Sequence, residues 1–193
     1  MLNDQINFEE PIHFDAIWEE TIAQNFGMPS DKQTGSLLRT LAATRPGGHL
    51  LELGTGTGIS TCWLLDGMDD HSRLITVDND EKPLSVARKY LGNDPRIEIH
   101  LDNGENVISR LPAESIDFIF ADAWPGKYNH LTEALALLKK GGIYLIDDML
   151  PQPNWPAGHG EKAARLVQWF EENEAFRITK MNWSTGLLLA VKK

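Results

Sequence analysis

The sequence has 193 residues, of which 41% are hydrophobic and 24% charged, and these values are typical of a globular protein with one core. The formal net charge of −10, with no basic cluster longer than a pair, argues against a nucleic-acid-binding surface and favours a small-molecule partner. No apolar run approaches the roughly 18 residues that span a bilayer, no secretory signal is recognisable and Cys62 is the single cysteine, so we expect a cytoplasmic protein without a membrane segment.

The first 46 residues predict two helices. The first ends at residues 27–30 and has an apolar face formed by Phe14, Ile17, Trp18 and Ile22. The second ends at residues 46–48 and has an apolar stripe formed by Leu37, Leu38, Leu41 and Ala42. The apolar face of the first helix either covers a sheet or forms the interface of a homodimer, and both interpretations stay open.

From residue 49 onward, strands alternate with helices. Strands are expected at residues 49–53, 74–77, 96–101, 116–121 and 143–146. One of the intervening helices is expected to carry a stripe that is closed by Gly141-Gly142 and formed by Leu131, Ala134, Leu135 and Leu138. A later helix near residues 163–170 precedes two β segments, at residues 176–181 and 187–191.

This alternation predicts an α/β fold: a Rossmann-like, doubly wound, mostly parallel seven-stranded sheet with a C-terminal antiparallel hairpin. We expect one domain over residues 1–193, with N-terminal helices in residues 1–46 and the cofactor-binding sheet in residues 47–193.

Three glycines, Gly54, Gly56 and Gly58, lie between a predicted buried strand and the following helix. Glycine here permits a tight turn and a close approach of the backbone to a ligand, while the helix N-terminus offers unpaired N–H groups to an anion. A dinucleotide site typically has the spacing G-x-G-x-x-G. Ile59 occupies the sixth position, which weakens the interpretation as a nicotinamide dehydrogenase.

Polar residues lie at the ends of the first three predicted strands. Glu52 requires a polar partner, either the ammonium group of a ligand or nearby backbone N–H groups. Asp78 can accept both ribose hydroxyls of a nucleoside, because the helix N-cap is more naturally Asn79 or Asp80. The segment Asp102-Asn103-Gly104 either lies beside an adenine ring or forms a simple Asx turn.

This arrangement resembles the class I S-adenosylmethionine-dependent methyltransferases, and residues 51–60 followed by Asp78 look like the catechol and caffeoyl-CoA type O-methyltransferases. The resemblance extends from Met28 to Leu150 and implies S-adenosylmethionine as the cofactor. It places the segment at residues 28–30, with Gly35, near the methionine end of that cofactor. Together with the strand-end residues, it implies cofactor contacts for Ser30, Glu52, Gly54, Thr55, Gly56, Ser60, Asp78, Asn79, Asp102, Asn103, Gly104, Asp122 and Trp124.

Three carboxylates follow the fourth and fifth predicted strands: Asp122, Asp147 and Asp148. Carboxylates brought together at one sheet edge repel one another unless they are protonated or bind a cation, and Mg²⁺ or another divalent cation prefers such oxygen ligands. Metal-dependent members of the resembled family carry aspartate at the end of the fourth strand and Asp-Asn at the end of the fifth. The alternative is that Asp147 or Asp148 caps a loop and Asp122 contacts only the cofactor.

The resembled family has its general-base lysine three residues after the strand-four aspartate, where this sequence has Pro125. We expect Asp122 to orient the acceptor, and Lys127 or His130 to take its proton. Lys127 either reaches the site from a re-routed loop or is solvated, and His159 is a further candidate base. Trp124 either stacks on the adenine or simply packs.

The segment at residues 151–159 contains three prolines, and we expect it to run over the carboxyl edge of the sheet, where substrates bind. Trp155 either forms a wall for an aromatic substrate or pins this loop. The sequence therefore predicts O-methylation of a small-molecule acceptor, for which an aromatic compound is one candidate. N-methylation and a non-catalytic S-adenosylmethionine-binding module are the alternatives.

Overall fold

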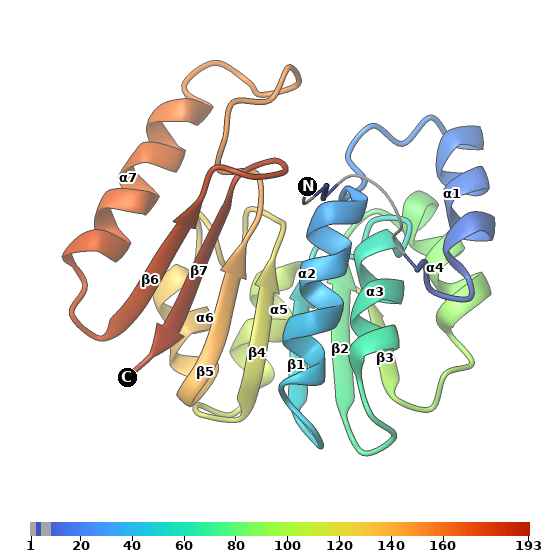
Figure 1. The fold of residues 1–193 in the computed structure, drawn as a ribbon, viewed down its shortest axis with the longest axis horizontal. Helices are drawn as coiled ribbons and strands as arrows, with labels where there is room; N and C mark the ends of the chain where they lie inside the picture. Colours follow the sequence, from blue (N-terminus) through green and yellow to red (C-terminus); the bar gives the residue numbers. More distant parts are fainter. Residues whose placement is uncertain (1–2, 5–8) are drawn as a thin grey trace.

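The computed structural model describes residues 3–4 and 9–193, and one seven-stranded sheet organises them (Figure 1). The strand order is β3-β2-β1-β4-β5-β7-β6. The strands are β1 (His49–Leu53), β2 (Arg73–Asp78), β3 (Ile97–Leu101), β4 (Ile116–Ala121), β5 (Leu138–Ile146), β6 (Phe176–Met181) and β7 (Leu187–Lys192). The first five strands are parallel, and β7 pairs antiparallel with both β5 and β6, so the predicted sheet and C-terminal hairpin are confirmed.

Helices connect the strands and precede them. They are α1 (Phe14–Ala23), α2 (Lys32–Ala43), α3 (Ile59–Gly67), α4 (Glu81–Leu91), α5 (Gly104–Arg110), α6 (Leu131–Leu137) and α7 (His159–Glu172). Among the described residues, none of these helices is long and apolar enough to cross a membrane.

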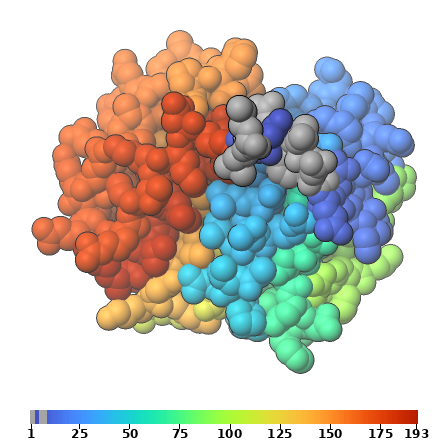
Figure 2. Space-filling view, viewed as in Figure 1, coloured from blue at the N-terminus to red at the C-terminus, as the bar shows by residue number. Residues whose placement is uncertain are grey.

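The sheet separates two apolar cores, because successive side chains of a strand point to opposite faces. In β1, Leu50 packs in the core that α1, α2 and α3 cover, whereas Leu51 and Leu53 pack in the core that α5, α6 and α7 cover. Figure 1 shows α2 and α3 in front of the sheet and α5 and α6 behind it. In Figure 2, α2 (light blue) lies between the C-terminal hairpin (red) and α3 (teal).

Two details of the predicted helices are wrong. Leu138 begins β5 instead of ending a helix, because it pairs with Ile116 across the sheet, and the Gly141-Gly142 pair lies within this strand beside a register shift. In α1, the buried residues are Phe14, Ile17 and Thr21. The side chains of Trp18 and Ile22, which were expected on the buried face, are exposed. The α1 helix covers part of the first core through Phe14 and Ile17, and the homodimer stays a prediction.

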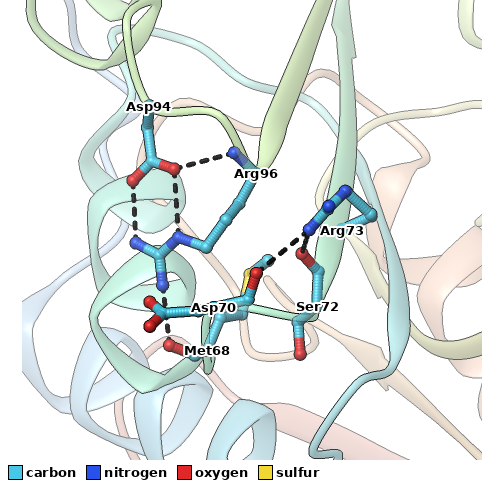
Figure 3. A network of polar contacts seen from close by, with 6 residues as sticks. All are labelled: Met68, Asp70, Ser72, Arg73, Asp94 and Arg96. Atoms are coloured by element: carbon cyan, nitrogen blue, oxygen red, sulfur yellow. Dashed lines mark hydrogen bonds and ion pairs between the residues drawn. The ribbon is translucent and has the colours of Figure 1, made fainter.

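A polar network ties the amino ends of β2 and β3 to the chain after α3 (Figure 3). The Arg96 guanidinium forms a two-point ion pair with Asp94, with its Nε and Nη2 atoms 3.0 and 2.7 Å from the two carboxylate oxygens, and donates to the carbonyl of Met68 at 2.7 Å. Arg73 donates to the carbonyls of Asp70 and Ser72. This network lies at the edge of the sheet opposite the carboxyl ends of the parallel strands.

Candidate functional site

The glycine turn lies where the strand order reverses, between the carboxyl ends of β1 and β4, which is the usual ligand position in such sheets. Gly54 has φ of +102°, and a Cβ added there would lie 2.7 Å from the carbonyl oxygen of Asp122. Gly58 has φ of +94° and begins α3. The backbone conformation therefore favours glycine at both positions, and at Gly54 the close approach of Asp122 also requires it.

A cavity of about 420 Å³ opens beside this turn. Its volume is within the usual range for a small-molecule site. The predicted residues that line it are Ser30, Gly54, Thr55, Gly56, Ser60, Asp78, Asn79, Gly104, Asp122 and Trp124, and Asp148 joins them. Phe26 also lines it, with its ring close to Gly56, and was missed. The only signal was an aromatic residue just before the helix-breaking segment at residues 27–30.

Asp78 lines the cavity at the end of β2. Its carboxylate accepts the backbone N–H groups of Gly56 at 2.8 Å and Asp80 at 3.0 Å. Asp80 is the N-cap of α4 and accepts the N–H of Lys82, as one of the two alternatives predicted. Since each carboxylate oxygen has two lone pairs, Asp78 retains acceptor capacity for a ligand hydroxyl.

Glu52 lies outside this cavity lining and is completely buried. Its carboxylate accepts hydrogen bonds of 2.6 Å from the hydroxyls of Ser60, Thr61 and Thr76. Its protein partners are thus hydroxyls and not the backbone N–H groups of one alternative, and a contact with a ligand ammonium stays a prediction. Burial raises the pKa of Glu52 to about 7, against the opposing effect of these hydrogen bonds. Glu52 is connected to the cavity through Ser60, whose hydroxyl donates to it and which lines the cavity.

Asp102 and Asn103 are likewise not part of the cavity lining. The Asp102 carboxylate accepts from the Asn103 N–H and the Asn106 amide and pairs with Arg110 at 2.8 Å, which is the local turn role left open from the sequence. Asn103 accepts from the side-chain amide of Asn79 at 3.2 Å. Neither residue lines the cavity in the structure, and their cofactor contacts stay predictions.

Gly104 follows and does line the cavity. A Cβ there would lie 2.9 Å from Pro125, so the first turn of α5 packs tightly on the loop after β4. Gly35 takes a different position from the one expected. It lies in α2, where its backbone touches the buried indole of Trp63.

The three aspartates of the predicted metal site differ in their surroundings. Asp122 and Asp148 line the cavity. Asp147 is only 2% exposed and is not in the lining, because its carboxylate accepts the Thr185 hydroxyl and the N–H of Asp148. Burial raises the pKa of Asp147 to about 7, and burial together with Asp147 raises the pKa of Asp122 well above its usual range.

The expected divalent-cation site is not supported. Within residues 3–4 and 9–193, no three His, Cys, Asp or Glu side chains are arranged so that they could hold a metal ion. Asp147 instead caps the backbone of Asp148, which has φ of +55°. This is the loop-capping alternative considered from the sequence.

A lysine supplies positive charge near these carboxylates. Lys127 lies in a turn in which the N–H groups of residues 127–129 all donate to the carbonyl of Trp124. Lys127 is only 5% exposed, and the charge of its ammonium group lowers the pKa values of both Asp122 and Asp147. Lys127 is therefore not the solvated lysine of one alternative, but it is not part of the cavity lining, and its reach into the site stays a prediction.

The two candidate histidines have opposite environments. His130 is exposed, begins α6 with φ of +54° and lies 3.7 Å from Glu133, away from the cavity lining, so it does not fit the role of base. His159 is 7% exposed, and its Nε2 atom lies 3.0 Å from the Tyr128 hydroxyl. Burial lowers the pKa of His159, which favours the neutral ring.

Aromatic rings surround His159. Trp155 packs against it with ring centroids 4.3 Å apart, so Trp155 pins the loop, as one of its alternatives predicted. Trp124 approaches His159 edge-on at 6.0 Å and lines the cavity, while the Lys162 ammonium lies 4.0 Å from the centre of the Trp124 ring. Trp124 thus forms the boundary between the cavity and this aromatic cluster.

Comparison with known proteins gives a consistent result. A family model described as a methyltransferase domain matches residues 51–149. A Mycobacterium marinum protein whose name assigns it provisionally to the O-methyltransferases is 35% identical over 149 residues, which cover 75% of this chain and 65% of that protein. The chain therefore spans less than two thirds of the length of this relative.

Solved structures share the fold across almost the whole chain. An O-methyltransferase from Bacillus cereus in complex with SAH has a TM-score of 0.84 at 20% identity, with 98% of this chain and 94% of that chain covered. A Staphylococcus aureus protein described provisionally as a caffeoyl-CoA O-methyltransferase has a TM-score of 0.79 at 18% identity, with 97% of this chain and 93% of that chain covered. At these identities the likeness concerns the fold.

Proposed function

Because the chain belongs to the family described as methyltransferase domain, we propose that it transfers a methyl group from S-adenosylmethionine to an oxygen atom of a small molecule. The observation that carries this proposal is one cavity that joins the glycine turn and Asp78 to Asp122, whose pKa is raised by burial and partly lowered again by the charge of the buried Lys127. The glycine turn and Asp78 suit the binding of a nucleoside, and Asp122 with Lys127 suits the transfer of a proton and the stabilisation of charge.

The polarity of the cavity supports one orientation of the cofactor. Asp78 would accept the ribose hydroxyls, and the adenine would lie between Gly104 and Trp124. Ser60 and the N-terminus of α3 would receive the carboxylate of the methionine portion, since unpaired N–H groups at a helix N-terminus favour an anion. The sulfonium would then face Asp122 and Ser30, whose hydroxyl lies 3.4 Å from the Asp122 carboxylate.

In the proposed reaction, a bond forms between the acceptor oxygen and the methyl carbon while the carbon–sulfur bond breaks, and the electron pair stays on sulfur. The acceptor hydroxyl gives its proton to Asp122, whose raised pKa suits it to act as a base. The Lys127 ammonium stabilises the negative charge that develops on the oxygen. No step uses a divalent cation.

The test measures transfer of labelled methyl from S-adenosylmethionine across a panel of phenols and other hydroxy compounds, with wild type, Lys127→Met and the exposed control Lys193→Met. We expect wild type and control to label an acceptor, and Lys127→Met to be slower by about 10²-fold or more while its cofactor Kd is unchanged. If wild type binds the cofactor but labels no acceptor, the chain is a binding module and the proposed enzyme function is wrong.

A further inference from the structure

The turn between β6 and β7, residues 182–186, lies at the same edge of the sheet as the N-terminus of α2 (Figure 1). It connects the two strands of the C-terminal hairpin. Ser184 has φ of +58° and Gly186 has φ of +85°, so the turn holds two residues in the left-handed region. Its hydroxyl groups connect two segments that border the candidate site.

The first connection joins the turn to the start of α2. The Ser184 hydroxyl donates to the Asp31 carboxylate, and it lies 2.8 Å from the Thr34 hydroxyl, which can donate to it. Asp31 is itself the N-cap of α2 and accepts the Thr34 N–H at 2.8 Å. Because Ser30 precedes this cap and lines the cavity, the turn is linked to one cavity wall.

The second connection joins the turn to the end of β5. The Thr185 hydroxyl donates to Asp147, and the same Asp147 oxygen accepts the Asp148 N–H at 2.7 Å. The Thr185 carbonyl accepts the N–H of Leu150 at 2.9 Å. Asp148 lines the cavity in a left-handed conformation that is uncommon for non-glycine residues. The Asp147 carboxylate, which Thr185 holds, bonds to its N–H group in this conformation.

We propose that Thr185 is a positioning residue that acts through Asp147 to fix Asp148 in the wall of the cavity. Ser184 anchors the same turn to α2, so the turn sets the spacing between the Ser30 and Asp148 walls. The acceptor would lie between these walls, and in this respect the inference rests on the proposed methyl transfer. Without the Thr185 hydroxyl, the Asp147 carboxylate loses a donor and is free to rotate away from the Asp148 N–H.

The test compares Thr185→Val, which removes the hydroxyl at nearly constant shape, with Thr185→Ser, which keeps it. Thr179→Val, at an exposed position of β6, is the matched control. Hydrogen exchange of the Asp148 amide, followed by NMR, reports the Asp147 bond directly. In Thr185→Val we expect at least tenfold faster exchange, and wild-type rates in Thr185→Ser and in Thr179→Val.

Kinetics provide the functional readout. We expect Thr185→Val to lower kcat about tenfold through misplacement of the acceptor, with the KM for S-adenosylmethionine unchanged and kcat restored in Thr185→Ser. An unchanged Asp148 exchange rate, an unchanged kcat, or a loss that Thr185→Ser does not repair would overturn the inference. If wild type transfers no methyl group at all, the proposed function fails, and the Asp148 amide then decides the inference alone.

Discussion

At the scale of single residues, the site is organised by buried charge. Two carboxylates at the ends of neighbouring strands, Asp122 and Asp147, have raised pKa values because burial disfavours their ionised forms. Lys127 partly offsets this effect. The chain itself thus supplies positive charge near these carboxylates.

Removal of divalent metal should therefore leave catalysis intact. Asp147 is held by the Thr185 hydroxyl and the Asp148 N–H, so the aspartates do not converge on one point. We expect the initial rate of methyl transfer to be the same in EDTA and in Mg²⁺. A rate that is lost in EDTA and restored by Mg²⁺ would show that the carboxylates rearrange around a cation and that our assignment is incorrect.

The buried Glu52 makes the free energy of unfolding depend on pH. Its pKa is about 7 in the fold and near 4.5 as a free carboxyl group, so between these values the folded state binds a proton that the unfolded state releases. The stabilising contribution is complete below pH 4.5 and is lost as the pH rises through 7, a change of about 3 kcal/mol in the free energy of unfolding.

Glu52→Gln should remove this dependence. Denaturant titrations measure the free energy of unfolding at each pH. Between pH 4.5 and pH 7, we expect this free energy to fall by about 3 kcal/mol more in wild type than in the variant. The exposed Glu19→Gln serves as the control and should follow wild type. Equal slopes for wild type and Glu52→Gln would mean that Glu52 is ionised in the fold throughout this range.

At the scale of elements, the periodicity of apolar residues was sufficient to predict the strands and their connecting helices. It failed at Leu138, since an apolar residue between a helix and a strand fits both patterns until its pairing with Ile116 is known. It also failed for the exposed face of α1. There Thr21, a polar residue, takes a buried position because its hydroxyl bonds to the Ile17 carbonyl and to Thr57.

The contact between α2 and α3 depends on a glycine. A Cβ at Gly35 would overlap the indole of Trp63, which is completely buried. We expect Gly35→Ala to lower the free energy of unfolding by about 1–3 kcal/mol through overpacking, even though alanine favours a helix by about 1 kcal/mol over glycine.

Gly27→Ala is the matched control, because its added Cβ meets no atom within 4 Å. It should change stability by less than about 0.5 kcal/mol. Denaturant unfolding of the two variants measures both effects. A Gly35→Ala protein as stable as wild type would show that the α2–α3 spacing is adjustable.

At the scale of the whole molecule, the candidate site is assembled from the glycine turn, the ends of β2, β4 and β5, and the segment before α2. The sequence predicted these segments because parallel strands end at one edge and glycine and aspartate mark those ends. The resemblance to the class I methyltransferases is confirmed by the family match over residues 51–149.

Side-chain partners could not be predicted in the same way. The hydroxyl partners of Glu52, the Thr185 bond to Asp147 and the burial of Lys127 depend on segments that are distant in the sequence or on the path of one loop. A pattern of residue types fixes which strand end a carboxylate occupies, but not which hydroxyl reaches it. This is why the sequence predicts three aspartates in one cluster, whereas in the structure Asp147 accepts the N–H of Asp148 and caps a loop.

The crystal structure of the full chain with S-adenosylhomocysteine would test the central claim most directly, because it locates both ends of the cofactor in one cavity. We predict that the ribose hydroxyls lie within hydrogen-bond distance of the Asp78 carboxylate, that the adenine contacts Trp124, and that the sulfur faces Asp122. A nucleoside bound outside the cavity, or a ribose that does not contact Asp78, would contradict the assignment of this cavity as the S-adenosylmethionine site.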